Sequence, residues 1–164
     1  MMRKLLGQMK ALNRDTSFIA IADEQDFSIW TVGVPPQQLS DAGLQKLRSQ
    51  LTVWAHCANE PEVLQIELRF PADFPNGGPP FVRILKPRFK MHTGHITIGG
   101  SICADFLTKH KWDPSLSLET VLRSVLNLML EGRAEIDIYN RYPTYSLSEA
   151  QDAYQRMLRV HNWS

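Results

Sequence analysis

The segment from Pro71 to Pro80 restricts the fold of this chain more than any other part of its sequence. Four of its ten residues are prolines, and Gly77 and Gly78 lie between them. Proline fixes φ and lacks a backbone N–H group, so this segment can form neither a helix nor a central strand. Before it, residues 63–70 alternate between apolar and polar side chains, as in a half-buried strand. We therefore predict two strands, 63–70 and 81–85, that are joined by an irregular loop.

Two β-rich runs precede this pair of strands, at Ser17–Ala22 and Phe27–Val34. Residues 23–26, which separate the two runs, have the polarity of a hairpin loop. Pro35 and Pro36 end the second run. The order of these runs predicts a meander of four antiparallel strands.

Apolar side chains at helical spacing predict two helices in the first third of the chain. The N-terminal helix has Leu5, Met9 and Leu12 on one face, and its other side is basic because it carries Arg3, Lys4, Lys10 and Arg14. A shorter helix has Leu44, Leu47 and Leu51 in register, and Ser40 can cap it.

Two more helices are predicted after the loop at 86–111, a long segment of the kind that is often functional. A central helix has an apolar stripe from Leu118 to Met129, with Ser115 or Ser117 as its N-cap and Gly132 at its end. Ser146 and Glu149 have capping-box spacing ahead of the last helix. We predict an α+β fold, in which a four-stranded antiparallel meander sheet packs on the central helix, with N- and C-terminal helices beside it.

Length and composition narrow the classes of protein. The 164 residues predict one domain at 1–164. The 18 basic and 17 acidic residues nearly cancel, so no charge imbalance indicates nucleic acid or an anionic membrane as a partner. No apolar run approaches the roughly 20 residues that a membrane span needs. The two cysteines lack disulfide spacing, which favours a reducing, cytosolic or nuclear location.

Cys103 is the sharpest candidate for chemistry, because it follows Gly99 and Gly100, which can present a side chain at the surface. A buried, inert cysteine is the alternative that spacing alone leaves open. Cys57 has no glycine-rich neighbourhood, and we interpret it as a structural residue.

Three histidines lie near Cys103 in the sequence, at positions 92, 95 and 110. They raise two alternatives, a Cys/His nucleophile pair and a metal site. A zinc site usually has closely spaced pairs of ligands, whereas this stretch has a lone cysteine with scattered histidines. We therefore predict no metal, and the residues leave the Cys/His pair open.

Three groups of residues in this order resemble the ubiquitin-conjugating enzyme family: Phe70–Pro75 leading to Pro79-Pro80, then Gly100–Leu107, then Trp112–Pro114. Within that family the chain is most similar to the Q-type subgroup. That similarity lies in residues 79–83, in Gly-Gly-Ser-Ile-Cys at 99–103, and in residues 145–151 with the later His161-Asn162-Trp163. The resemblance covers nearly the whole chain and is strongest at 70–132 and from Tyr145 onward.

The resemblance implies the fold of that family and a transferase activity without a cofactor. Cys103 matches the cysteine that accepts ubiquitin, or a ubiquitin-like protein, from an activating enzyme as a thioester and passes it to a lysine or a ligase. His95 stands where most members have an asparagine, and it is expected to brace the loop or to donate to the oxyanion. The acidic residue that helps to deprotonate the lysine is matched by Asp137 or Glu135.

The resemblance also assigns surfaces. The residues expected to face ubiquitin or a ligase are Asp105, Trp112, Pro114 and Asn76, and those expected to face the activating enzyme are Arg3, Lys4 and Lys10. One rival is a catalytically idle ubiquitin-binding scaffold of the same fold, although such variants typically lack the cysteine. Another is a cysteine hydrolase, for which the sequence has no recognisable orienting His/Asp set.

Overall fold

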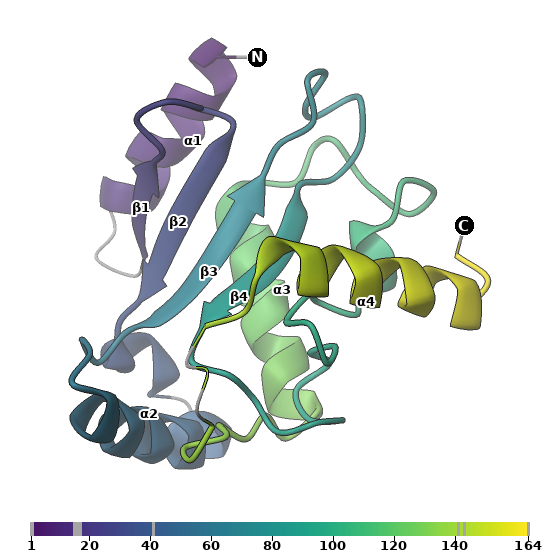
Figure 1. The fold of residues 1–164 in the computed structure, drawn as a ribbon. Coiled ribbons are helices and arrows are strands. Elements are labelled where there is room, and N and C mark those ends of the chain that lie inside the picture. The colour runs from purple at the N-terminus through teal and green to yellow at the C-terminus, as the bar shows by residue number, and fades with distance from the viewer. Residues whose placement is uncertain (1, 15–17, 41, 141, 143, 164) are drawn as a thin grey trace.

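A computed structural model describes residues 2–14, 18–40, 42–140, 142 and 144–163. Its elements follow the predicted order, with a helix, a strand meander, a long loop and further helices (Figure 1). The α+β architecture is therefore confirmed. Ser17, the first residue of the earliest predicted strand, lies outside the described residues.

The sheet has four antiparallel strands in the order β1 (Ile19–Ala22), β2 (Ile29–Val34), β3 (Leu64–Arg69) and β4 (Phe81–Lys86). Its register places apolar residues opposite each other, with Trp30 beside Leu68 and Ile66 beside Ile84. The β1–β2 connection is the predicted polar hairpin. Its Asp23 side chain accepts hydrogen bonds from the backbone N–H groups of residues 25 and 26, at 2.9 and 3.0 Å.

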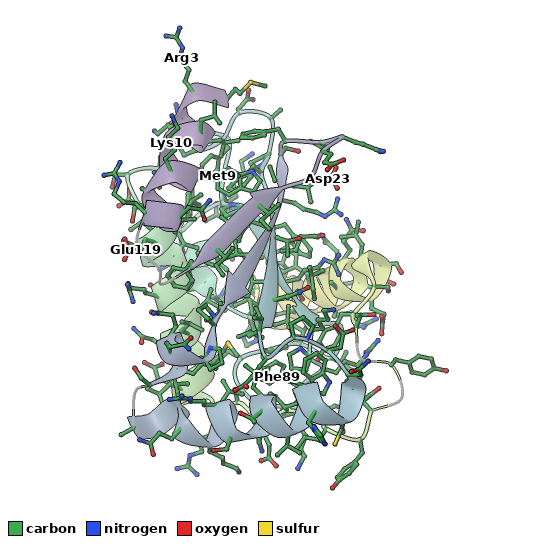
Figure 2. The ribbon with its side chains drawn as sticks, turned by 90° about the vertical axis from the view of Figure 1, so that its left-hand side faces the viewer. Arg3, Met9, Lys10, Asp23, Phe89 and Glu119 are labelled. Carbon is green, nitrogen blue, oxygen red and sulfur yellow. The ribbon has the colours of Figure 1, made fainter. Side chains whose placement is uncertain are left out.

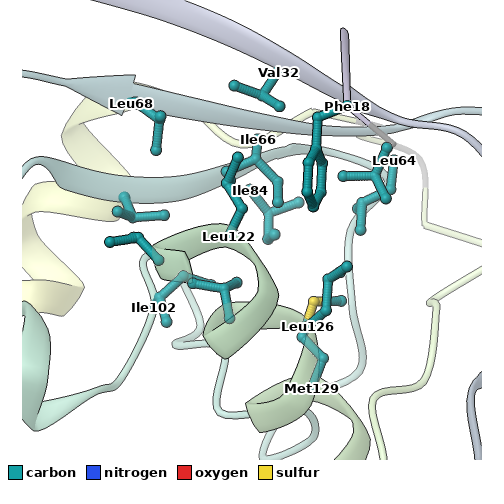
Figure 3. Packing of buried hydrophobic residues seen from close by; sticks show 14 of the residues in the cluster. Phe18, Val32, Leu64, Ile66, Leu68, Ile84, Ile102, Leu122, Leu126 and Met129 are labelled. Atoms are coloured by element: carbon teal, nitrogen blue, oxygen red, sulfur yellow. The ribbon is translucent and has the colours of Figure 1, made fainter. Parts of the chain in front are cut away.

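The two long C-terminal helices cover opposite faces of the sheet. In Figure 1, α3 (Leu118–Glu131) lies behind the strands and α4 (Leu147–Val160) crosses in front of β4, and Figure 2 shows the same arrangement from the side. The core lies between the sheet and α3, where Ile66 and Ile84 pack toward Leu122 (Figure 3). Helix α1 (Met2–Arg14) packs beside β1.

The caps of these helices explain where they begin. Ser117 caps α3 and accepts a hydrogen bond from the N–H of Thr120, so it is the N-cap rather than Ser115. Ser146 and Glu149 form the predicted capping box at the start of α4, in which each side chain accepts a hydrogen bond from the other residue's N–H.

The helix predicted after Ser40 is longer than expected and begins later. The chain first forms two 3-10 turns, η1 (Pro36–Leu39) and η2 (Ala42–Leu44), and only then α2 (Gln45–Ala58). Ser40 follows η1 and does not cap α2, so that assignment was wrong. The three predicted apolar residues, Leu44, Leu47 and Leu51, are nonetheless buried.

The structural interpretation of Cys57 was also wrong, because its side chain is exposed. Helix α2 buries Trp54 and Ala55 together with the leucines one and two turns earlier. Position 57 is rotated away from that stripe, at 100° per residue, and therefore faces solvent.

A buried ion pair lies on the α4 side of the sheet. The Glu67 carboxylate accepts hydrogen bonds from Nε and Nη2 of Arg83, at 2.7 and 3.1 Å, and from Nε of Arg69 at 2.6 Å. Glu67 and Arg83 are only 6% and 5% exposed. Burial opposes ionisation of Glu67, but the hydrogen bonds from the two arginines outweigh it and lower its pKa.

We expect Glu67→Gln to lower the free energy of unfolding by about 3 kcal/mol at pH 7, because it leaves the Arg83 charge buried without its counter-ion. Since folding lowers the pKa of Glu67, its stabilising contribution is present above the unfolded pKa and is lost as the pH falls through the folded one. The difference in free energy of unfolding between the parent and Glu67→Gln, measured by denaturant titration, should therefore decrease at acidic pH. Glu24→Gln, on the exposed hairpin, is the control, and an equal cost for both variants would contradict the prediction.

Candidate functional site

Backbone hydrogen bonds to the free edge of β4 hold the segment that carries Cys103. The N–H of Ile84 donates to the carbonyl of Gly100 at 2.8 Å, and the N–H of Ile102 donates to the carbonyl of Val82 at 3.1 Å. Ser101 and Ile102 are consequently buried. Cys103 is thus the first residue after a short stretch of sheet-edge pairing, which fixes its position relative to the core.

A tight turn precedes this stretch. The N–H of Gly100 donates to the carbonyl of Thr97 at 2.9 Å, and the N–H of Thr97 donates to the carbonyl of Ser101 at 2.9 Å. The two hydroxyl oxygens of Thr97 and Ser101 are 2.7 Å apart. The turn reverses the chain so that residues 96 and 102 face each other as an antiparallel bridge.

Gly99 and Gly100 are required here for a reason that their sequence did not indicate. A Cβ on Gly99 would lie 2.0 Å from the carbonyl oxygen of Glu149, and a Cβ on Gly100 would lie 2.6 Å from the ring of Tyr145. Gly100 also has φ of +91°, which disfavours other residues. The glycine pair therefore lets the start of α4 approach the cysteine segment at backbone distance.

The Cys103 thiol is half-buried and lies close to a histidine. The backbone N–H of Cys103 donates to the carbonyl of His95 at 2.7 Å, and its Sγ lies 3.8 Å from Nε2 of His161. Burial raises the pKa of the Cys103 thiol. The thiol is therefore mostly protonated at neutral pH. To react as a thiolate it needs a proton acceptor, or positive charge brought close to it by a bound partner protein.

Cys103 opens onto a pocket of about 330 Å³ that is lined by His92, His95, Ile96, Thr97, Cys103 and Gly132. Two of the three histidines considered from the sequence thus share the pocket with the thiol, whereas His110 is exposed outside it. Both pocket histidines have left-handed backbones, with φ of +61° at His92 and +54° at His95. Histidine and asparagine are among the residues enriched in this conformation.

Gly94 and Gly132 also approach each other closely, and Gly132 is one of the residues that line the pocket. The N–H of Gly94 donates to the carbonyl of Gly132 at 2.8 Å, and a Cβ on Gly132 would lie 2.8 Å from the Cα of Gly94. Gly132 is the C-cap of α3, as predicted, but with φ of −79° it is not left-handed. Its lack of a side chain lets the His95 loop pack against the end of α3.

His161 is the residue of this site that the sequence did not reveal. It is the C-cap of α4, and its ring stacks on Trp163 with centroids 4.6 Å apart. It is 58 residues from Cys103 in the chain. The only signal was the C-terminal His-Asn-Trp, which resembled a family pattern but was not linked to the cysteine by spacing.

The two acidic candidates are not among the residues that line the thiol pocket. Glu135 pairs with Lys90 and, at 3.2 Å, with Lys46, and the hydrogen bonds from these lysines lower its pKa. The Asp137 carboxylate accepts a hydrogen bond from Asn140 at 2.9 Å. The residues that line the pocket include neither carboxylate, so the role assigned to Asp137 stays a prediction.

The residues expected at the ubiquitin- or ligase-facing surface lie on neighbouring loops. Nε1 of Trp112 donates to the carbonyl of Pro75 at 2.7 Å, which ties the loop of Pro114 to that of Asn76. Pro114 and Asn76 are exposed, as is Asp105 on η3 (Asp105–Leu107). The basic residues expected to face the activating enzyme, Arg3, Lys4 and Lys10, are exposed on α1. Figure 2 shows Arg3 and Lys10 on this helix.

The described part of the chain offers neither a metal cluster nor a membrane span. Within it, no group of three or more His, Cys, Asp or Glu residues could hold a metal ion. Its helices are all too short or too polar to cross a bilayer.

Comparisons with known proteins agree on one family. Residues 12–161 match the family model described as "Ubiquitin-conjugating enzyme". The chain is 30% identical over 100 residues to human "Ubiquitin-conjugating enzyme E2 Q1", and the match covers 61% of this chain but only 23% of that protein. It is 29% identical over 102 residues to a human ubiquitin-conjugating enzyme described as Q-like protein 1, and this match covers 61% of this chain and 62% of that one. These relatives confirm the predicted Q-type resemblance.

A solved structure supports the fold. The crystal structure of a ubiquitin-conjugating enzyme E2 from Plasmodium falciparum matches with a TM-score of 0.55 at 20% identity. The match covers 77% of this chain and 81% of the other.

We expect the alkylation of Cys103 by iodoacetamide to be shifted to higher pH in the folded chain than in the denatured chain. Because burial raises its pKa, less thiolate is present at a given pH in the folded state. Peptide mass spectrometry after timed alkylation measures Cys103 and Cys57 separately. A folded-state profile shifted to lower pH would contradict the prediction, since the contact with His161 would then outweigh burial.

Proposed function

The chain belongs to the ubiquitin-conjugating enzyme family, and from this premise we propose that Cys103 carries ubiquitin, or a ubiquitin-like protein, as a thioester. The observation that carries the proposal is the placement of Cys103, which is anchored to the β4 edge and opens onto a pocket lined by two histidines. Cys57 is exposed on α2 and lines none of the site. The matched region spans about a quarter of the E2 Q1 relative, so activity and partners are part of the proposal.

Loading is a thioester exchange. The Cys103 thiolate attacks the thioester carbonyl on the activating enzyme, a new C–S bond forms, and the activating enzyme's cysteine leaves as thiolate. The thiol proton must go to a base, and the nitrogen in contact with Sγ, at 3.8 Å, is Nε2 of His161, which accepts a proton in the tautomer that leaves it unprotonated. We assign His161 as the proton acceptor during loading, because a base placed there offsets the burial that favours the neutral thiol.

Discharge is the attack of a lysine amine on the loaded thioester. The amine forms a bond to the carbonyl carbon, negative charge collects on the carbonyl oxygen, and Cys103 leaves as the amine loses its proton. His95 lines the pocket, and its carbonyl already holds the Cys103 N–H. The backbone of His95 therefore braces the loop, which leaves its imidazole available to donate to the oxyanion.

The partners follow from the same premise. The exposed basic residues of α1 would contact the activating enzyme, since charge complementarity raises association rates. The loops joined by the Trp112–Pro75 hydrogen bond would face ubiquitin or a ligase. Two unpaired cysteines suit a reducing compartment such as the cytosol or nucleus.

The central claim is tested by incubating the chain with activating enzyme, ATP and ubiquitin and looking for a reductant-sensitive adduct on a non-reducing gel. Cys103→Ala should abolish the adduct, because no other thiol lines the pocket. Cys57→Ala is the matched control and should load like the parent, since its side chain faces solvent. Loading by Cys103→Ala would disprove the thioester assignment, and no loading by the parent would favour an idle ubiquitin-binding scaffold.

A series at His95 separates the oxyanion donor from the backbone brace. His95→Asn should retain much of the discharge to free lysine, because its amide can donate and it tolerates φ of +54°. His95→Gly suits that backbone but has no donor, and should discharge about 10²-fold more slowly. His95→Ala lacks the donor and also strains the backbone, so it should additionally lower the melting temperature.

The readout of this series is single-turnover discharge of the preloaded chain, with thermal unfolding of each variant in parallel. If His95→Gly discharges like the parent, the imidazole has no role in the transfer. If Gly and Asn lose activity equally, donation to the oxyanion is not what His95 supplies.

A further inference from the structure

Three residues connect the start of α4 to the segment that follows β4. The Arg88 guanidinium lies over the Tyr145 ring, 4.5 Å from its centroid, and its Nη2 donates to both carboxylate oxygens of Glu149 at 2.9 and 3.1 Å. The Tyr145 hydroxyl accepts a hydrogen bond from the N–H of Phe89 at 2.8 Å. We call Arg88, Tyr145 and Glu149 the α4 clamp.

The backbone at Tyr145 is tied to the sheet as well. Its N–H donates to the carbonyl of Leu85 at 2.9 Å, and its carbonyl accepts from Nη1 of the buried Arg83 at 2.9 Å. Glu149 serves twice, because the carboxylate that pairs with Arg88 also completes the capping box of α4. The start of α4 is therefore fixed to the end of β4 by both backbone and side-chain contacts.

The clamped end of α4 packs on the segment that carries Cys103, and so do its middle and its far end. The Tyr145 ring packs on Gly100, and the Glu149 carbonyl lies over Gly99. From there α4 runs along the segment that carries Cys103, and at its middle the Tyr154 hydroxyl donates to the carbonyl of Leu107 at 3.1 Å. At its far end His161 reaches the Cys103 thiol.

A helix of 14 residues is about 21 Å long and behaves as a rigid rod. A small rotation at its clamped end is therefore transmitted to His161. Misplacement of a catalytic group by about 1 Å can cost roughly 10²-fold in rate. A pair of charged residues that contacts neither the thiol nor its pocket can thus decide whether His161 is in reach of Sγ.

We propose that Arg88, Tyr145 and Glu149 are positioning residues for the chemistry of Cys103, acting through α4 to hold His161 against the thiol. The proposal rests on the proposed thioester function for its effect on loading, but its effect on the thiol is independent of ubiquitin. The clamp releases in two ways, by loss of the Arg88–Glu149 charge pair or by loss of the contact between Tyr145 and Gly100.

The test uses two variants of the pair and one matched control. Glu149→Gln removes the charge but keeps a side chain that suits a capping box. Arg88→Gln removes the guanidinium group that donates to the Glu149 carboxylate. Glu60→Gln is the control, because Glu60 forms a similar partly buried ion pair with Lys86, at 2.7 Å, on the α2 side of the sheet. Thermal unfolding is measured for each, so that transfer is compared among folded proteins.

We expect both clamp variants to load ubiquitin roughly tenfold more slowly, a part of the 10²–10⁴ that a positioned base contributes. Glu60→Gln should load like the parent. His161→Ala should also be slow, and Arg88→Gln added to His161→Ala should slow it little further, because both changes remove the same interaction. Multiplicative effects in the double variant would overturn the proposal, since the clamp would then act by another route.

Alkylation of Cys103 by iodoacetamide at pH 8 provides the readout that needs no ubiquitin. Release of α4 uncovers the half-buried thiol, so Arg88→Gln and Glu149→Gln should be alkylated several-fold faster than the parent and than Glu60→Gln. Faster alkylation in a chain that does not load would support the clamp while rejecting the thioester function. Unchanged alkylation and unchanged loading in both clamp variants would overturn the clamp and leave that function standing.

Discussion

Pairing of the Gly100–Ile102 segment with the free edge of β4 is the interaction on which the rest of the site depends. The chain leaves β4 at Lys86 and runs through an irregular loop before it returns to the same strand. Two backbone hydrogen bonds to residues 82 and 84 then connect the segment before Cys103 to the sheet. One face of this sheet is buried against α3. The two hydrogen bonds also cover a strand edge that would otherwise be open to other chains.

Close approaches at glycines position the elements that surround the thiol. Gly99 and Gly100 admit the start of α4, and Gly94 meets Gly132 at the end of α3. These contacts hold the loop at glycines, and the side chain at position 95 lines the pocket. The resemblance to the family leads us to expect asparagine at this position, and both asparagine and histidine tolerate the left-handed conformation found there.

The electrostatics of the site favour the protonated form of the Cys103 thiol. Burial raises the pKa of Cys103, and the carboxylates of Glu135 and Asp137, outside the pocket, are engaged with Lys90, Lys46 and Asn140. A protonated thiol is a poor nucleophile and resists oxidation, because the thiolate is the reactive form. In the proposed function, deprotonation of the thiol during loading then depends on His161, whose Nε2 lies 3.8 Å from Sγ.

Local patterns in the sequence determined the meander, the central helix, the capping box at Ser146 and the candidacy of Cys103, because period, caps and glycine-rich turns act between residues a few positions apart. Such patterns did not indicate the delayed start of α2. The exposure of Cys57 does follow from helical periodicity, because the residue lies off the apolar stripe of α2, but the interpretation considered only the lack of glycines beside it. Only the tertiary structure decided that the imidazole beside the Cys103 thiol is that of His161, 58 residues along the chain. That contact depends on how α4 crosses the sheet edge, which is set by long-range packing that no local spacing encodes.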